Sequence, residues 1–306
     1  MEQKGNPVFQ FRNGVSPRYI KPMFIRLQYD RWYSTNQLVH LLHTNGLDVE
    51  GTDIVSYNAH TWSLVGLGRL AKRRIGNKST NMFHLTDLGK QLIDTYSTNP
   101  DLFYDLMHFL FYSSYRRSGD LKRGCFWLYA SICNTLWLEA PAQIDNSSLT
   151  NRLQIECREA FPGYDPSFSK RSVWGVFPWL QTLVPPFLSK PGAKSQLYSK
   201  RRSYCTPQLF HLATDMVYMS MEGVQYGTAL SVNEQQKEDI CKLCLLDPEK
   251  FWEMADLTQM TISGYEIHQG QWGVSITLEG SPTWIKLPDF SDEKVDEDEF
   301  DDGGEV

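Results

Sequence analysis

The stretch AKRRIGNKSTNMFHLTDLGKQL, Ala71 to Leu92, combines three structural signals in one short segment. The cations Lys72 to Arg74 lead into Ile75, GNKST has the composition of a turn, and MFHL reads as a returning strand. Thr86 is placed to cap a helix that buries Leu88 and Leu92. The stretch therefore predicts a basic β-hairpin followed directly by a helix.

The residues before this hairpin predict three helices. Apolar residues recur at helical spacing over 20–27, Ser34 and Gln37 fit a capping box for a second helix that Gly46 ends, and 51–70 predicts a third. Asp53 is the expected cap of the third helix. Three helices, a basic hairpin and a closing helix form a winged helix-turn-helix, with the hairpin as its wing. The alternative is an ordinary α+β domain with a solvated basic loop.

The polar residues of this unit predict contacts with duplex DNA. Ser56, Tyr57 and His60 lie on the side of the third helix opposite its apolar face and would face the major groove. Between residues 68 and 90 the chain has six basic residues and one acidic residue, which favours phosphate contacts. The expected wing cations are Arg69, Lys72, Arg73, Arg74 and Lys78.

Two aromatic-rich helices are predicted next, NPDLFYDLMHFLFYSSYRR and RGCFWLYASICNTLWLEAP. Apolar residues surround them almost completely, which indicates the buried centre of a domain. The cations between them form a secondary candidate patch: Arg116, Arg117, Lys122 and Arg123.

A weaker copy of the first pattern covers residues 146–204. Two helices, over 148–160 and 167–183, precede a long basic segment over 185–204 that predicts a second wing. The alternative is a helical domain with a mobile basic loop. The candidate DNA-binding residues here are Lys170, Arg171, Lys190, Lys194, Lys200, Arg201 and Arg202.

The whole chain is predicted to be mainly α, of the α+β class. The expected parts are an arm and winged helix (1–97), a helical linking core (98–145), a second winged helix and following helix (146–232), a C-terminal α/β segment with a small hairpin (233–288) and a disordered acidic tail (289–306).

Net charge divides the chain in two. The tail carries −9 and the rest +3, although the total is −6. The tail would repel DNA and could cover the basic face until a partner displaces it; the alternative is a purely solubilising tail.

No pattern in the sequence predicts catalysis. There is no phosphate-binding Gly-rich loop, no nucleophile elbow and no His-Glu-x-x-His. Cys241 and Cys244 form one Cys-x-x-Cys without a second pair, whereas a zinc site needs four ligands. We therefore expect no enzyme, no cofactor and no metal. The N-terminus lacks a secretion signal and no apolar run approaches the length of a membrane span, so we expect a cytoplasmic protein with reduced thiols.

The order of these pieces resembles an uncharacterised prokaryotic family encoded beside DNA phosphorothioation genes and related phage-defence genes. The resemblance rests on FQFRNGVSPRYIKPMF, FHLTDLGKQLI, the two aromatic helices and SKRSVWGVFPWLQTL, and spans most of Phe9 to Leu257. The family usually has Arg-His-Glu near its N-terminus, where this chain has Arg12-Asn13-Gly14. The resemblance implies a genome-defence setting.

Three functions fit these observations. The first is a non-catalytic subunit that binds double-stranded DNA for a defence complex. The second is a protein–protein adaptor of such a complex, because a wing can also insert between protein partners. The third is a stand-alone transcriptional regulator, which would need a dimer for two-fold half-sites.

Overall fold

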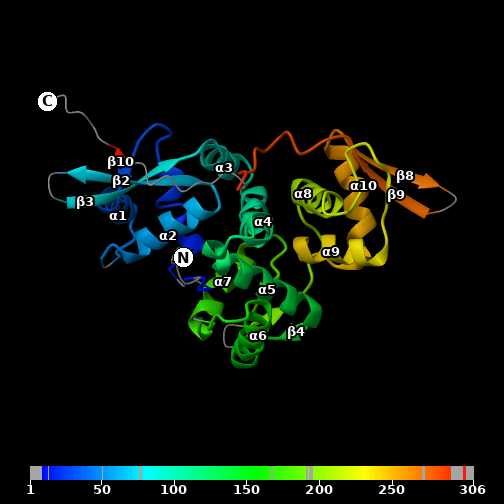
Figure 1. Ribbon diagram of the computed structural model, residues 1–306, viewed down its shortest axis with the longest axis horizontal. Helices are drawn as coiled ribbons and strands as arrows, with labels where there is room; N and C mark the ends of the chain where they lie inside the picture. The colour runs from blue at the N-terminus through cyan, green and yellow to red at the C-terminus, as the bar shows by residue number, and fades with distance from the viewer. Residues whose placement is uncertain are drawn as a thin grey trace.

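A computed structural model describes residues 9–12, 14–49, 51–75, 78–166, 168–190, 192, 196–270, 273–290 and 299–300 of the chain. The fold is α+β, as predicted: mostly helices, with one four-stranded and two three-stranded sheets among the described residues. Figure 1 shows a sheet-bearing N-terminal unit at one end, a helical centre and a sheet-bearing C-terminal unit at the other end.

The N-terminal unit contains the second and third predicted helices, the hairpin and the closing helix in the predicted order, whereas the first predicted helix does not form. The Ser34–Gln37 capping box is confirmed: the Gln37 amide donates to Ser34 Oγ at 3.3 Å and the Ser34 amide donates to Gln37 Oε1 at 2.8 Å. The strand order is β1-β3-β2, with both pairings antiparallel. The elements are β1 (Tyr33–Ser34), α1 (Thr35–Thr44), α2 (Asp53–Leu64), β2 (Gly68–Ile75), β3 (Lys78–Leu85) and α3 (Asp87–Thr98).

Three local predictions in this unit need correction. The segment 20–27 forms only a 3-10 turn, η2 (Phe24–Arg26), after η1 (Pro17–Tyr19). Helix α2 ends at Leu64 because Gly66 takes a left-handed φ of +80°, so the chain turns into β2 earlier than predicted. Asp53 is the first helical residue and Thr52, without a side-chain bond, is the cap.

The N-terminal arm is packed into the core. Phe9 and Phe11 are at most 1% exposed, and their rings contact aromatic residues of the central helices, with Phe11 5.4 Å from Phe111. The Trp179 indole donates to the Val15 carbonyl at 3.1 Å. The arm therefore ties the N-terminal unit to the rest of the molecule.

Glycine lets the hairpin β2–β3 and the closing helix α3 approach closely. A Cβ on Gly68 would lie 2.2 Å from the Phe83 ring across the hairpin. A Cβ on Gly89, in α3, would lie 2.1 Å from the Leu67 carbonyl oxygen. Because Thr86 caps α3 through the Gly89 amide at 3.1 Å, the start of this helix is fixed against the root of the hairpin.

The predicted aromatic helices form the centre. More than half of the residues of α4 (Pro100–Ser118) and of α5 (Gly124–Glu139) are buried, as the sequence indicated. Phe111 and Phe126 stack at 5.7 Å between them. The aromatic residues of these two helices therefore belong to the core and do not form an exposed surface on which bases could stack.

The region of the expected second winged helix also has helices followed by a hairpin. Its strands are only two residues long and form the order β4-β6-β5. The paired strands of the hairpin within 185–204 are therefore far shorter than the length of this basic segment suggested. The elements are β4 (Ala142–Gln143), α6 (Asn146–Ala160), α7 (Lys170–Thr182), β5 (Leu188–Ser189) and β6 (Tyr198–Ser199).

The C-terminal unit contains the predicted hairpin joined by a third strand, in the order β7-β9-β8. Its helices pack beside α4 and α5 (Figure 1). The elements are α8 (Pro207–Tyr218), β7 (Leu230–Ser231), α9 (Glu234–Cys244), η4 (Pro248–Lys250), α10 (Phe251–Thr261), β8 (Tyr265–Gly270) and β9 (Gly273–Leu278).

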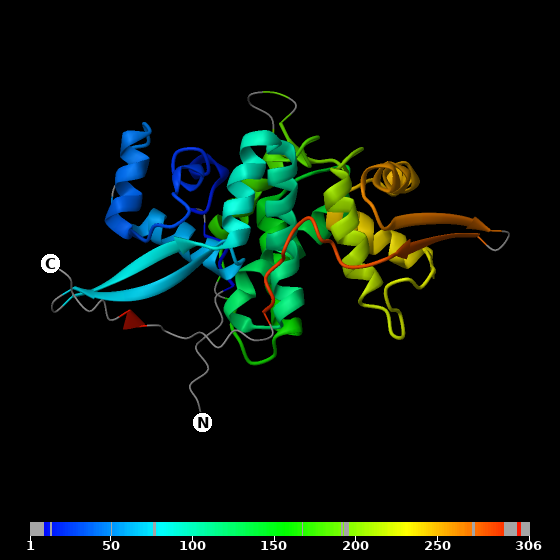
Figure 2. The same cartoon turned by 90° about the horizontal axis from the view of Figure 1, so that it is seen from above.

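The segment after β9 returns to the N-terminal unit. Figure 2 shows it crossing the central helices. The Trp284 carbonyl accepts a bond from Gln91 Nε2 in α3 at 2.5 Å, and the Pro288 carbonyl accepts one from Arg117 at 2.6 Å. We call residues 280–290 the return segment. Its last residue, Phe290, lies 4.0 Å from the Arg123 guanidinium.

The predicted disordered tail differs from the structure where the structure describes it. Asp289 and Phe290 belong to the return segment, and β10 (Glu299–Phe300) pairs in parallel with β2. Glu299 is opposite Lys72 and Phe300 is opposite Arg73. The acidic tail therefore reaches the outer edge of the basic hairpin.

Candidate nucleic-acid interface

The basic hairpin β2–β3 presents cations along its first strand. Arg69 is paired with His84, Lys72 with Asn81 and Arg73 with Thr80. The two-residue period of a strand puts Arg69 and Arg73 on one face and Lys72 on the other. Arg69 and Lys72 are exposed and Arg73 is half-buried. Arg74 and Lys78 lie in the strands, but their side chains fall outside the described part of the structure.

The three residues of helix α2 that were predicted to face the major groove differ in exposure to solvent. His60 is exposed, whereas Ser56 and Tyr57 are half-buried. Desolvation, and secondarily the charge of Arg12, lower the pKa of His60, so its imidazole is neutral at pH 7 and offers hydrogen bonds rather than charge. The Arg12 guanidinium lies 4.0 Å above the Tyr57 ring.

The basic residues predicted for the second wing, within 146–204, differ in exposure: some are exposed and others pack against the core. Lys170, Arg171, Lys190 and Lys200 are exposed. Arg201 is half-buried, with its guanidinium 4.4 Å above the Trp137 ring and its Nε donating to the Trp137 carbonyl at 3.1 Å. Lys194 lies outside the described residues.

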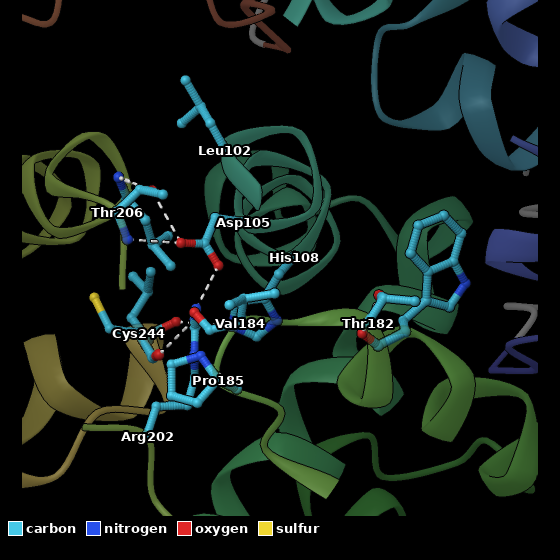
Figure 3. Close-up of polar contacts among 12 residues, drawn as sticks. Leu102, Asp105, His108, Thr182, Val184, Pro185, Arg202, Thr206 and Cys244 are labelled. Atoms are coloured by element: carbon cyan, nitrogen blue, oxygen red, sulfur yellow. Dashed lines mark hydrogen bonds and ion pairs between the residues drawn. The ribbon is translucent and has the colours of Figure 1, made fainter. Parts of the chain in front are cut away.

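Arg202 is a correction to the predicted interface. It is 1% exposed, and it forms an ion pair at 2.8 Å with Asp105 of α4 (Figure 3). Its guanidinium also donates to the carbonyls of Val184, Pro185 and Cys244. Asp105 Oδ2 in turn accepts two bonds from Thr206. With its donors engaged in the core, Arg202 has no access to a DNA phosphate.

The return segment covers two of the four residues of the secondary patch between α4 and α5. Arg117 and Arg123 hold the Phe290 ring between them, at 5.2 and 4.0 Å. Arg123 is also 3% exposed and donates to the Leu64 carbonyl at 2.9 Å. These two arginines serve the packing of the return segment, while Arg116 and Lys122 are exposed.

The cysteines offer no metal site within the described residues, where no group of three or more His, Cys, Asp or Glu side chains has suitable geometry. Cys241 and Cys244 are fully buried, and burial raises the pKa of both thiols. They are structural thiols. Among the described residues, no helix has the length and apolar character needed to cross a membrane.

Sequence reasoning missed two arginines of a groove beside Tyr57. Arg12 and Arg18 belong to the predicted N-terminal arm, and only the packing of that arm against α2 and α7 brings them next to Arg171. The sequence shows two arginines seven residues apart inclusive, but nothing local indicates their neighbours.

These observations define a mainly helical α+β protein with a basic hairpin beside a polar helix face. No family model and no curated protein matches the sequence. Two solved structures share the fold, described as "Magnesium ion-bound SspB crystal structure" and "SspB crystal structure". Both are 12% identical to this chain and cover 90% of it and 81% of their own chain, with TM-scores of 0.53 and 0.51. The likeness shows a shared fold over most of the molecule.

Proposed function

We propose that this protein is a non-catalytic, double-stranded-DNA-binding subunit of a prokaryotic DNA-modification or phage-defence complex. The N-terminal unit is a winged helix-turn-helix in this proposal, with α2 as the recognition helix and β2–β3 as the wing. The observation that carries it is the exposure of Arg69 and Lys72 on a hairpin directly after a helix that presents His60.

The setting of the proposal comes from the resemblance in the sequence to proteins encoded beside phosphorothioation and phage-defence genes. The fold shared with SspB structures supports treating most of the chain as one related architecture. The absence of a recognisable catalytic motif in the sequence favours an accessory role.

The test is duplex binding across a salt series. Reversing the charge at Arg73 and Arg74 to Glu removes two phosphate contacts, so we expect the slope of log affinity against log salt to fall by about 2. Fluorescence anisotropy with a labelled duplex measures it.

The matched control reverses Lys237 and Lys250, which pair with nearby glutamates in the C-terminal unit, far from the wing (Figure 1). Undiminished binding by the wing variant, with wild-type thermal stability, contradicts the proposal.

A second candidate is a protein–protein adaptor. Strand β10 shows that the outer edge of β2 accepts a peptide strand, and a partner's strand can dock by the same backbone pairing. Failure of the wild-type protein to bind duplex DNA at low salt, with and without its tail, would favour this role over DNA binding.

A further inference from the structure

A groove with a volume of about 740 Å³ lies where the N-terminal arm, α2 and α7 meet. Its side chains come from segments more than 100 residues apart, so only the tertiary fold creates it. It is lined in part by Arg12 and Arg18 of the arm, Tyr57 of α2 and Arg171 of α7.

The groove is held open by backbone contacts of the arm. Asn58, which is fully buried, donates to the Gly14 carbonyl at 2.8 Å and so fixes the arm to α2. The Trp179 indole fixes Val15 to α7. Arg12 leaves this anchored segment, and its guanidinium carbon lies 4.0 Å from the centre of the Tyr57 ring. The guanidinium group is therefore held at the wall of the groove by this cation–π contact.

The groove has excess positive charge. Three arginines line it against a single acidic residue, Asp53. Within the described residues, no carboxylate lies within 4 Å of the guanidinium of Arg12, Arg18 or Arg171, although twelve ion pairs of that length are present elsewhere. Helix α7 begins at the groove with no acidic residue in its first turn, so its positive dipole end is not neutralised.

We propose that this groove binds phosphoryl groups, and that in the complex these belong to one strand of duplex DNA passing from α2 to α7. Planar guanidinium groups and a helix N-terminus are suited to phosphate oxygens. The inference rests on the proposed function and extends it. DNA would contact the wing and α2 in the N-terminal unit, and then Arg12 and Arg171 where the arm meets α7.

The test is the double variant Arg12→Gln/Arg171→Gln, compared with Arg26→Gln/Arg158→Gln, which removes two exposed arginines outside the groove. With a labelled duplex between about 50 and 200 mM salt, the groove variant should lower the salt slope by about 2. At low salt it should lower affinity by about tenfold for each arginine. The control pair should leave both quantities near wild type.

Two measurements guard against misfolding and against the wrong ligand. Arg12→Lys keeps the charge but loses the guanidinium group that lies over Tyr57, so it should retain more affinity than Arg12→Gln. Calorimetry with inorganic pyrophosphate, at constant ionic strength, tests whether a small phosphate compound fills the groove. Pyrophosphate binding that the groove variant loses, without duplex binding, would assign the groove to a free phosphate ligand and overturn the DNA-strand assignment.

The outcomes separate this inference from the proposed function. If wild type binds duplex and only the wing variant weakens binding, the groove proposal is wrong and DNA binding stands. If wild type binds neither duplex nor pyrophosphate, both fail. If a peptide of residues 291–306 competes through Arg12 and Arg171, the groove is a site for the acidic tail instead.

Discussion

At the scale of single residues, the same side-chain type serves opposite purposes in this protein. Arg69 is exposed on the hairpin, whereas Arg202 is enclosed and ion-paired with Asp105. A sequence shows both as members of basic runs. The difference arises because the chain after β6 passes beneath α4 and α9, where a guanidinium can satisfy three carbonyls and a carboxylate (Figure 3).

Removing Arg202 should therefore affect stability rather than DNA binding. Arg202→Met leaves the Asp105 carboxylate buried without its cation, and we expect the free energy of unfolding to fall by about 3–5 kcal/mol. Chemical denaturation measures this. The double variant Arg202→Met/Asp105→Leu removes both charges and should recover part of the loss. A single variant as stable as wild type would show that the ion pair is not structurally important.

At the scale of elements, the position of the hairpin β2–β3 depends on how closely α3 approaches its root. Gly89 places the first turn of α3 against the Leu67 carbonyl, and Thr86 links the two elements by accepting the Gly89 amide and donating to the Gly66 carbonyl at 2.5 Å. Close packing against Leu67 therefore explains why position 89, inside a helix, is occupied by glycine.

Gly89→Ala tests this approach. Alanine favours a helix by about 1 kcal/mol over glycine, but its Cβ would lie 2.1 Å from a backbone oxygen that cannot move aside as a side chain can. We expect net destabilisation of about 1–3 kcal/mol, typical of overpacking. Thermal unfolding measures it.

Ser97→Ala in the same helix is the control, because Ser97 is exposed and its loss should be neutral or slightly stabilising. A Gly89→Ala variant more stable than wild type would contradict the close packing.

At the scale of the whole molecule, the described part of the chain after β9 returns from the C-terminal unit to the N-terminal unit. The return segment carries the chain from the C-terminal unit across α4 to Arg117 and Arg123 (Figure 2). Strand β10 then lies along Lys72 and Arg73. The described residues Glu299 and Phe300 therefore lie beside the surface that the proposed function assigns to DNA, and they belong to a tail whose sequence carries a net charge of −9.

Deleting residues 291–306 should strengthen duplex binding. The tail competes for the edge of the wing and adds a repulsive field, so its removal should raise affinity at low salt by roughly tenfold. The same anisotropy assay measures it. A full-length variant with the tail acids changed to Asn and Gln separates the effect of charge from that of strand pairing. Unchanged affinity on deletion would leave the tail a solubilising role.

The sequence by itself determined most elements of the N-terminal unit, from α1 to α3, but not the 3-10 turns over 17–26 where it predicted a helix. Short-range rules sufficed there: the Ser34–Gln37 capping box, the Thr86 cap and the apolar spacing of α3 depend on residues three or four apart. The aromatic composition of α4 and α5 likewise indicated their burial. Element boundaries were less certain, since Gly66 ended α2 before the apolar pattern stopped.

Only the tertiary structure decided which cations face solvent and which segments meet. Three features depend on contacts between residues tens to more than a hundred positions apart in the chain. They are the ion pair of buried Arg202 with Asp105, the packing of Arg117 and Arg123 on Phe290, and the groove lined by Arg12 and Arg171. Charge and periodicity are local properties of a chain, whereas desolvation of a charge depends on which distant segments pack around it.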